Sequence, residues 1–298
     1  MSRRRALITG ATGFVGSHLA RHLAELGWEL HVLVRAGGAV PARPLGAAHV
    51  HDGTTEGMTR IVGEARPDVV FHLASLFVAE HRPDQVTALV ESNLLLGAQL
   101  AEAMRANGAT LLVNTATAWL HYGGEEYDPT NLYAATKQAY LDLLRFYERA
   151  AGLRVITLEL YESYGPADPR PKLMTALIKA ARQGGSLALN DGKQRLDLVH
   201  VRDVTRAYQR AAERLLAGEA AAGERWAVRT GHPRSVREIV EMVGRAAGMP
   251  LDAEWGVRPY RARELMEPPE RPTLPGWRAE IPLDVGIREL LGDLHGGS

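Results

Sequence analysis

Hydrophobic positions in the first half of the chain form two alternating kinds of segment. Short apolar runs rich in β-branched residues occupy residues 5–9, 30–34, 48–51, 68–74, 110–116 and 154–160. Between them, the spacing of amphipathic helices covers residues 14–26, 55–65, 84–107 and 131–151. Strands that are apolar at nearly every position and alternate with helices are typical of a parallel sheet covered on both faces. The pattern therefore predicts an α/β fold, a Rossmann-type doubly wound parallel sheet with right-handed crossovers.

The pattern weakens after Gly165-Pro166, where proline, glycine and arginine become more frequent and the predicted helices shorten to 172–183, 235–247 and 284–292. Residues 195–215 instead predict a strand and a helix that return to the first unit. We therefore expect a first domain at residues 1–165, with 196–222 returning to it, and a smaller C-terminal α/β domain at 166–298.

Composition excludes several classes of function. Lys and Arg number 35, as do Asp and Glu, so no net charge attracts nucleic acid or an anionic membrane. The chain has no cysteine, and its 11 histidines show no spacing typical of metal ligands, so we expect no disulfide and no metal site. The start, MSRRRALITG, lacks the apolar core of a signal peptide, and no apolar stretch reaches membrane-spanning length. We expect a cytoplasmic protein without nucleic-acid or membrane partners.

The motif GATGFVG (10–16) follows the first predicted strand and opens the first predicted helix. Gly10 allows a sharp turn, Gly13 allows the backbone to approach a pyrophosphate, and Gly16 allows the helix and strand to pack closely. Backbone N–H groups at the helix start then bind the anion, with the helix dipole behind them. A glycine-rich turn alone is weak evidence, but its position between strand and helix predicts a dinucleotide site.

The end of the second predicted strand bears on which dinucleotide binds. An acidic residue there would hold the ribose 2′-hydroxyl of NAD, but this chain has Arg35, whose charge and planar donors suit a 2′-phosphate. We therefore predict NADP(H) as the cofactor, with NAD(H) as the alternative. The simplest explanation of Arg35 is a solvated arginine at the end of a strand. Asp52, just past the third strand, is either an acceptor for the adenine amino group or a turn residue.

Residues 130–137 read TNLYAATK and place Tyr133 and Lys137 one helical turn apart. A tyrosine hydroxyl has a pKa near 10, so proton exchange with a substrate near neutral pH calls for a positive neighbour that stabilises the phenolate. A lysine at i+4 lies beside the tyrosine and can also bind the nicotinamide ribose. A solvated helix face would show the same spacing, but the predicted dinucleotide site favours a catalytic pair.

The strand before this helix ends in NTATAW (114–119), which offers two hydroxyl groups for a substrate carbonyl oxygen. Thr117 is favoured and Thr115 remains the alternative. Whichever threonine is not used for chemistry is expected to hydrogen-bond its own backbone.

These motifs together resemble the extended short-chain dehydrogenases/reductases, the NAD-dependent epimerase/dehydratase family that acts on nucleotide sugars. The likeness covers nearly the whole chain and rests on GATGFVG, HLAS (72–75), Asn93, YAATK, SYGP (163–166), RLDLVHVRDV (195–204) and PGW (275–277). Two stretches, 115–139 and 160–173, are similar to the branch containing CDP-abequose and CDP-paratose synthases, which reduce the C4 ketone of a CDP-linked 4-keto-3,6-dideoxyhexose.

The resemblance implies a role for each matching position. Tyr133 would be the proton donor, Lys137 its partner and Thr117 the carbonyl-side hydroxyl. The implied cofactor-binding residues are Gly10, Thr12, Gly13, Phe14, Val15, Gly16, Arg35, Asp52, Gly53, Leu73, Ala74, Asn93, Tyr133 and Lys137. The implied substrate-binding residues are Asn93, Thr117, Lys172, Arg195 and Arg261.

The two arginines match positions that often bind the pyrophosphate of the substrate, which suits their planar donors, although each is equally compatible with a surface position. Lys172 and His200 are weaker candidates, and a buried core histidine fits the strand-like LVHV context of His200 better. The first domain would then bind the dinucleotide and the smaller domain the nucleotide sugar.

Two departures from the family pattern narrow the reaction. The 4,6-dehydratases carry an Asp-Glu pair directly after the catalytic hydroxyl, where this chain has Ala118-Trp119, so dehydration is disfavoured. Relatives usually have asparagine two positions before the tyrosine of the YGP turn, where this chain has Glu162, so the sugar contacts are expected to differ.

Three functions remain open on this basis. The favoured one is an oxidoreductase, an NADPH-dependent 4-ketoreductase of a nucleotide-linked deoxyhexose. The alternatives are an NAD-dependent 4-epimerase on the same scaffold and a catalytically inactive dinucleotide-binding sensor. The long helices at 84–107 and 131–151 are expected to form a homodimer interface if their outer faces are apolar.

Overall fold

A seven-stranded parallel sheet forms the centre of the computed structural model, which describes residues 3–37 and 45–292. The strand order is β11-β6-β5-β4-β1-β2-β3, and every neighbouring pair is parallel. The strands are β1 (Arg5–Thr9), β2 (Glu29–Arg35), β3 (Ala47–His51), β4 (Val69–His72), β5 (Leu111–Thr117), β6 (Arg154–Leu160) and β11 (Glu224–Val228). The order reverses between β1 and β4, which confirms the predicted α/β fold and its doubly wound, Rossmann-type sheet.

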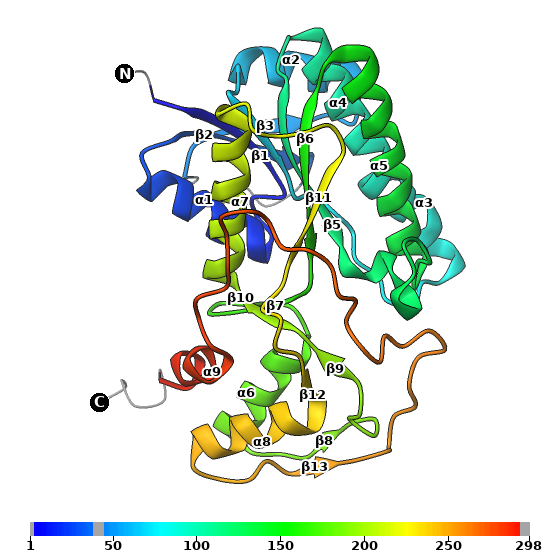
Figure 1. Ribbon diagram of the computed structural model, residues 1–298, viewed down its shortest axis with the longest axis vertical. Coiled ribbons are helices and arrows are strands. Elements are labelled where there is room, and N and C mark those ends of the chain that lie inside the picture. The colour runs from blue at the N-terminus through cyan, green and yellow to red at the C-terminus, as the bar shows by residue number, and fades with distance from the viewer. Residues whose placement is uncertain (1–2, 38–44, 293–298) are drawn as a thin grey trace.

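Helices cover both faces of this sheet, as Figure 1 shows. One face packs against α1 (Phe14–Glu25) and α7 (Val201–Leu216), and the other against α2 (Thr55–Ala65), α4 (Leu96–Ala106) and α5 (Leu132–Ala151). Each face has its own apolar core, because successive side chains of a strand point to opposite sides. The fully apolar strand pattern of the sequence follows from this double burial.

The helical run predicted at 84–107 is continuous but not uniform. It consists of η1 (Pro83–Gln85), α3 (Val86–Val90), a π-helical turn η2 (Glu91–Leu95) and α4. The wider turn carries Asn93, whose side chain is fully buried. π-Turns within helices are often found at functional sites because they redirect a side chain.

A smaller unit lies beyond the carboxyl ends of the central strands (Figure 1). Its core is formed by α6 (Leu173–Gln183), α8 (Val236–Ala247) and α9 (Leu283–Gly292), all close to the predicted ranges. Three short strand pairs join them: β7 (Glu162–Tyr164) with β10 (Leu198–His200), β9 (Arg195–Leu196) with β12 (Arg234–Ser235), and β8 (Leu187–Ala188) with β13 (Ala253–Glu254).

One strand lies where the sequence pattern did not place it. Residues 223–298 were assigned to the smaller unit, yet β11 pairs with β6 as an edge strand of the central sheet. The helix before it, α7, packs on the central sheet, so a short connection leads β11 directly to the open edge.

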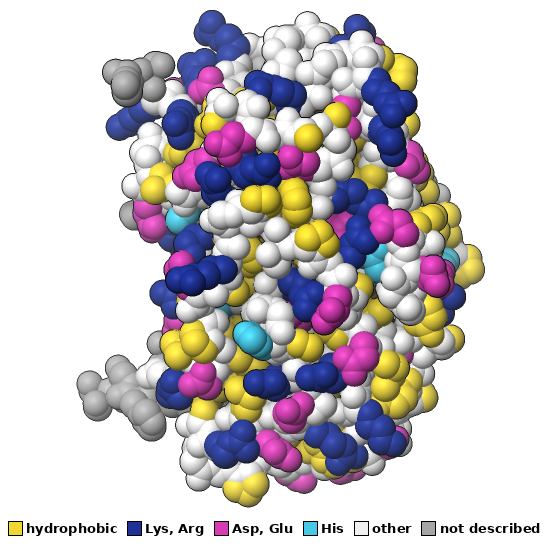
Figure 2. Space-filling model, in the orientation of Figure 1, with side chains coloured by type: hydrophobic (Ala, Val, Ile, Leu, Met, Phe, Trp, Pro, Cys, Tyr) yellow, Lys and Arg dark blue, Asp and Glu magenta, His cyan; other side chains and the backbone are white. Residues whose placement is uncertain are grey.

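The chain after β13 returns from the smaller unit to the central sheet, as the orange and red segment of Figure 1 shows. It pairs with β11 through the Ala227 N–H, which donates to the Pro272 carbonyl over 2.9 Å, and its Trp277 indole donates to the Asp203 carbonyl over 3.0 Å. On the face shown in Figure 2, basic and acidic side chains are interspersed rather than gathered by sign. None of the helices in the described ranges combines the length and apolar character needed to span a bilayer.

Candidate active site

The glycine motif forms the turn between β1 and α1. Gly10 has φ +73°, and a Cβ there would lie 2.6 Å from the Ala74 nitrogen, while a Cβ on Gly16 would overlap the Gly10 carbonyl oxygen. Both glycines are therefore required by the protein itself. A Cβ on Gly13 would meet only the Gly10 oxygen, at 3.3 Å, so the fold makes a weaker demand for glycine at this position. The space beside Gly13 is open to a ligand, as a pyrophosphate site requires.

The start of α1 also suits an anion. Within the described chain, no side chain caps this helix end and its first turn has no acidic residue, so its backbone N–H groups remain available. The neighbouring loop is held in place by the Thr9 hydroxyl, which accepts hydrogen bonds from the Leu73 and Ala74 N–H groups at 3.2 and 3.1 Å. The glycine turn, the start of α1 and the Leu73–Ala74 loop thus lie together at one edge of the sheet.

Arg35 is the last residue of β2, and Asp52 directly follows β3, as expected. Arg35 is exposed, and the chain just beyond it, 38–44, lies outside the described residues. Asp52 accepts hydrogen bonds from the Thr54 hydroxyl and N–H at 2.7 and 2.9 Å, and these bonds lower its pKa. The structure thus shows the turn role for Asp52 directly. The carbonyl of Gly53, next to it, accepts a bond from Gln99 over 2.8 Å.

Tyr133 and Lys137 lie on the first turns of α5, whose start is capped by the Asn131 side chain. Both are buried, with 9% and 2% of their surface exposed. Burial raises the pKa of Tyr133 to about 12, opposed by a hydrogen bond with Ser75 and supported by the charge of Glu162. Burial lowers the pKa of Lys137 to about 8. Burial thus acts against the acidification expected from Lys137, and with this raised pKa the phenol carries its proton at neutral pH.

The two candidate threonines of β5 have different surroundings. The Thr115 hydroxyl donates to the His72 carbonyl over 2.7 Å and lies 2.7 Å from the Tyr208 hydroxyl, so the protein uses both its donor and its acceptor. The Thr117 oxygen accepts a bond from the Trp119 N–H at 3.2 Å and has an O–H that donates to none of the described residues. Thr117 is therefore the hydroxyl left for a ligand.

Asn93 makes four hydrogen bonds inside the protein. Its amide nitrogen donates to the Leu76 carbonyl and the Thr136 hydroxyl, at 3.0 and 3.1 Å. Its oxygen accepts from the Leu76 N–H and the Ser75 hydroxyl, at 2.8 and 3.1 Å. These bonds use its full capacity. The direct cofactor and substrate contacts implied by the resemblance are therefore replaced by a positioning role, which fixes the Ser75–Leu76 backbone beside Tyr133.

An aromatic wall stands next to Tyr133. Phe77 makes edge contacts with Tyr133 and with Trp119, with ring centroids 5.1 and 5.3 Å apart. Two of the predicted substrate-binding cations rest on this wall, with Lys172 Nζ 4.6 Å from the Phe77 ring centroid and Arg261 5.5 Å from that of Trp119. Phe77, which is 43% exposed, belongs to none of the sequence motifs that predicted the site.

Glu162 and Lys172 form an ion pair with 3.0 Å between their charged atoms. This pair explains how a carboxylate occupies a position where relatives usually have asparagine, because Lys172 neutralises it beside the aromatic wall.

Two of the candidate residues, Arg195 and His200, have their described contacts away from the aromatic wall. Arg195 donates to the Pro233 carbonyl over 2.8 Å and lies 3.7 Å from Glu267, so its described contacts are with loops of the smaller unit. His200 is fully buried, and its ring accepts a bond from the Arg202 N–H at the start of α7. Burial lowers the pKa of His200 to about 4, as expected for a core histidine.

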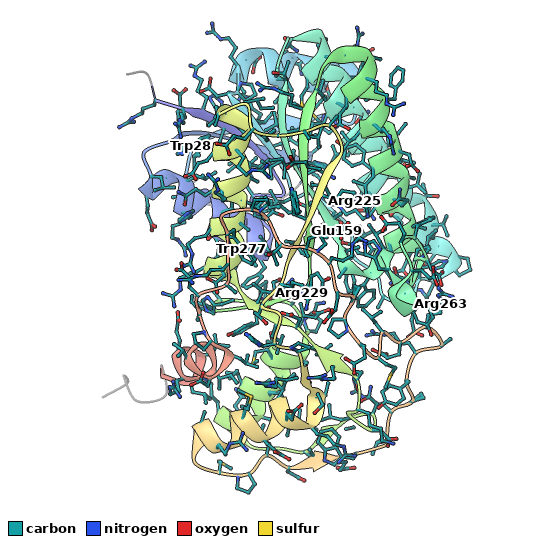
Figure 3. All side chains as sticks on the ribbon, viewed as in Figure 1. Trp28, Glu159, Arg225, Arg229, Arg263 and Trp277 are labelled. Atoms are coloured by element: carbon teal, nitrogen blue, oxygen red, sulfur yellow. The ribbon has the colours of Figure 1, made fainter. Side chains whose placement is uncertain are left out.

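Two sets of contacts hold the segment after β5 in place, one from the central sheet and one from the C-terminal part of the chain. On the side of the sheet, buried Glu159 bonds to His121 at 3.1 Å and to Arg225 at 2.8 Å. Burial raises the pKa of Glu159, but these partners hold it below its usual value. Figure 3 shows Glu159 and Arg225 side by side on the adjacent strands β6 and β11.

From outside, three arginines of the returning C-terminal segment contact residues 119–128. Arg261 packs on Trp119, Arg263 pairs with Asp128, and Arg271 pairs with Glu126. We call this set the arginine clasp.

Comparison with known proteins defines the class. The model of the NAD dependent epimerase/dehydratase family matches residues 6–225, which confirms the resemblance drawn from the motifs. The chain belongs to this family.

The relatives include both 4-epimerases and a CDP-abequose synthase. A UDP-glucose 4-epimerase of Mycolicibacterium smegmatis is 28% identical over 313 residues, covering 95% of this chain and 96% of the relative. A CDP-abequose synthase of Salmonella muenchen is 24% identical over 300 residues, covering 97% of each chain. The crystal structure of Thermus thermophilus UDP-glucose 4-epimerase with NAD has a TM-score of 0.82 at 28% identity, and covers 99% of this chain and 100% of the other.

Proposed function

We propose that this protein is an NADPH-dependent reductase of the C4 ketone of a nucleotide-linked 4-keto-deoxyhexose, a CDP- or dTDP-sugar. The observation that carries the proposal is the buried Tyr133–Lys137 pair, beside an available Thr117 hydroxyl that is followed by Ala118-Trp119. This arrangement supplies a proton donor and a carbonyl-binding hydroxyl, and it lacks the adjacent acid pair that dehydration requires. Similarity to a CDP-abequose synthase supports the same reading.

The roles of the residues follow from their surroundings. Gly13 and the N–H groups of α1 would hold the pyrophosphate of the nicotinamide cofactor, which supplies a hydride when bound. The Thr117 hydroxyl donates to the ketone oxygen, and Tyr133, protonated at neutral pH, transfers its proton to that oxygen as it becomes an alkoxide. Lys137 stabilises the phenolate that remains and binds the nicotinamide ribose.

The aromatic wall would carry the substrate. The rings of Phe77 and Trp119 suit the apolar face of a sugar ring. Lys172 and Arg261 lie beside these rings, and would exchange part of their contacts with Glu162 and Glu264 for the diphosphate. Arg195, whose described contacts are with Pro233 and Glu267, would reach the substrate from the side of the smaller unit. Arg35 supports NADPH over NADH, because an exposed guanidinium at the end of β2 suits a 2′-phosphate.

We also propose that the protein forms a homodimer. Apolar side chains are exposed along the outer helices, namely Val86, Val90, Leu95 and Phe146. Phe146 on α5 is 61% exposed, and Val86, Val90 and Leu95 lie on the neighbouring α3–η2 run, which also contacts α5. A second subunit could cover both helices in a four-helix interface.

The second candidate is a 4-epimerase, favoured by the similarity to UDP-glucose 4-epimerases over almost the whole chain. Its chemistry uses the same tyrosine and lysine but returns the hydride to the sugar, so it consumes no cofactor. An inactive dinucleotide sensor would bind cofactor and do neither reaction.

One experiment separates these candidates. Purified protein is incubated with NADPH and a CDP- or dTDP-linked 4-keto-6-deoxyhexose, and in parallel with NAD and UDP-glucose, and the products are analysed by mass spectrometry and NMR. Stoichiometric NADPH oxidation with a C4 alcohol as product is expected. Interconversion of UDP-glucose and UDP-galactose without net oxidation would overturn the proposal, as would NADPH binding without turnover of any 4-keto sugar.

A further inference from the structure

Four buried polar atoms between the sheet and α5 have no hydrogen-bond partner among the described residues. They are His72 Nε2, Asn114 Oδ1, Lys137 Nζ and Tyr140 Oη. Each parent side chain is at least 98% buried, since their exposed fractions are 0%, 1%, 2% and 0%. Such groups are costly to leave unpaired, so four of them in one region call for an explanation.

The four residues occupy one layer. His72 and Asn114 are paired in register on the neighbouring strands β4 and β5, so their side chains leave the sheet on the same side. Lys137 and Tyr140 are three residues apart on α5 and share a helix face. The rings of His72 and Tyr140 touch, with centroids 5.2 Å apart, which shows that the side facing α5 is the shared one.

The hydrogen bonds of Thr9 decide the protonation of His72. The Thr9 oxygen accepts from the N–H groups of Leu73 and Ala74, so its own hydrogen is left for His72 Nδ1 at 2.8 Å. Nδ1 is therefore the acceptor, and the ring hydrogen resides on Nε2. Burial lowers the pKa of His72 to about 3, with the charge of Lys137 adding to the effect, so the ring is neutral.

The four side chains together offer hydrogen-bond donors and acceptors. A small molecule that both donates and accepts hydrogen bonds would pair with all of them. His72 Nε2–H and the Lys137 ammonium donate, Asn114 Oδ1 accepts because its amide nitrogen donates to Thr157, and the Tyr140 hydroxyl does either. An inorganic cation is opposed by the Lys137 charge, and an anion by the Asn114 oxygen. A water molecule accepts two hydrogen bonds and donates two, and buried waters in proteins typically make about three.

We propose that His72, Asn114, Lys137 and Tyr140 hold an internal water behind the catalytic pair, and that this hydration site keeps Lys137 protonated. Asn114 and Tyr140 are then positioning residues that act through Lys137. The existence of the site is independent of the proposed function, whereas its effect on turnover rests on it. Burial lowers the pKa of Lys137 to about 8, which is close to physiological pH. Loss of a hydrogen-bond acceptor for the ammonium would lower this pKa further and reduce the protonated fraction of Lys137.

The titration of Lys137 tests the proposal without any substrate. The chain has only four lysines, at 137, 172, 179 and 193, so NMR of protein labelled with 13C-lysine resolves each one, and Lys137→Met identifies its signal. The titratable groups that face Lys137 are His72 on β4 and Tyr133 and Tyr140 on α5. His72 is already neutral above pH 6, and burial raises the pKa of both tyrosines, so a midpoint near pH 8 belongs to Lys137.

Tyr140→Phe removes one acceptor of the water and little else. The expected result is a lower titration midpoint for Lys137, and a kcat that falls about two- to fivefold at pH 8 with little change at pH 6.5. Tyr147→Phe is the matched control, because it removes a tyrosine hydroxyl from the same helix, one that bonds to Glu102 at 3.1 Å. It should leave the Lys137 midpoint unchanged.

An unchanged Lys137 midpoint in Tyr140→Phe would overturn the proposal. So would a high-resolution crystal structure of the unmodified protein in which these four groups bond directly to one another or enclose no water. A shifted midpoint in a protein that reduces no 4-keto sugar would leave the hydration site standing and reject the proposed function instead.

Discussion

The two faces of the central sheet treat their buried polar groups differently at the same edge. On the face covered by α7, the Thr115 hydroxyl bonds to the His72 carbonyl and to Tyr208, so each hydroxyl has a partner. On the face covered by α5, Lys137 and Tyr140 have none within the described chain. Unpaired buried groups reduce stability, and of these two pairs the one without partners lies on the face that carries the candidate chemistry. Both faces have an apolar core, and they differ in whether these buried polar groups are paired within the described chain.

Replacing Tyr133 by phenylalanine should have the largest effect. The variant loses the proton donor, so kcat for the proposed reduction should fall about 100- to 10,000-fold, the usual contribution of general acid catalysis. Stability should barely change, because the hydroxyl has a single hydrogen-bond partner among the described residues, Ser75. The measurements are NADPH oxidation under saturating substrate and the thermal midpoint. Undiminished turnover with intact NADPH binding would mean that the proton comes from another group.

Lys137→Met should stabilise the fold while it removes activity. The pKa of Lys137 is about 8 in the folded protein against 10.5 for an ordinary lysine, so below pH 8 the buried charge costs up to about 3 kcal/mol. Between pH 8 and 10.5 the unfolded chain binds more protons than the folded one at this residue, so the cost disappears as the pH rises. The variant should therefore be more stable by about 1–3 kcal/mol at pH 7 and by less at pH 10.

Chemical denaturation at the two pH values measures this difference, and pairing the two proteins at each pH cancels the other groups that titrate. A variant that is less stable than the natural protein at pH 7 would show that Lys137 supports the fold and that the two faces do not differ as described.

The smallest effect sharpens the comparison most directly. Tyr208→Phe removes a bonded hydroxyl and leaves Thr115 without one of its partners, so it should cost about 1 kcal/mol of stability. Tyr140→Phe removes a hydroxyl that bonds to no described residue, so it should cost less. Equilibrium denaturation of the two variants decides, and equal losses would contradict the contrast between the faces.

Local patterns account for most of what the sequence predicted. The six apolar runs, the GATGFVG turn and the Tyr133–Lys137 spacing each depend on neighbouring residues, and each is found where expected. The strand β11 was missed because its segment is short and lies next to a Pro- and Gly-rich region that masks its pairing with β6.

Other features depend on contacts that no local pattern carries. Thr115 and Thr117 are equivalent in sequence, and what separates them is Tyr208, 93 residues further along the chain. Asn93 was expected to touch ligands, but the π-turn and the Ser75–Leu76 backbone use all its hydrogen bonds. The position of Trp119 directly after Thr117 was a usable signal for the aromatic wall, whereas Phe77 offered none.

The arginine clasp has a consequence for how the protein is made. Residues 119–128 lie beside Thr117, yet the three arginines that hold them arrive only at positions 261–271. A nascent chain that has emerged as far as α7 can form most of the central sheet but lacks this restraint. The contacts that hold residues 119–128 from this side can therefore form only after positions 261–271 have been synthesised, late in translation.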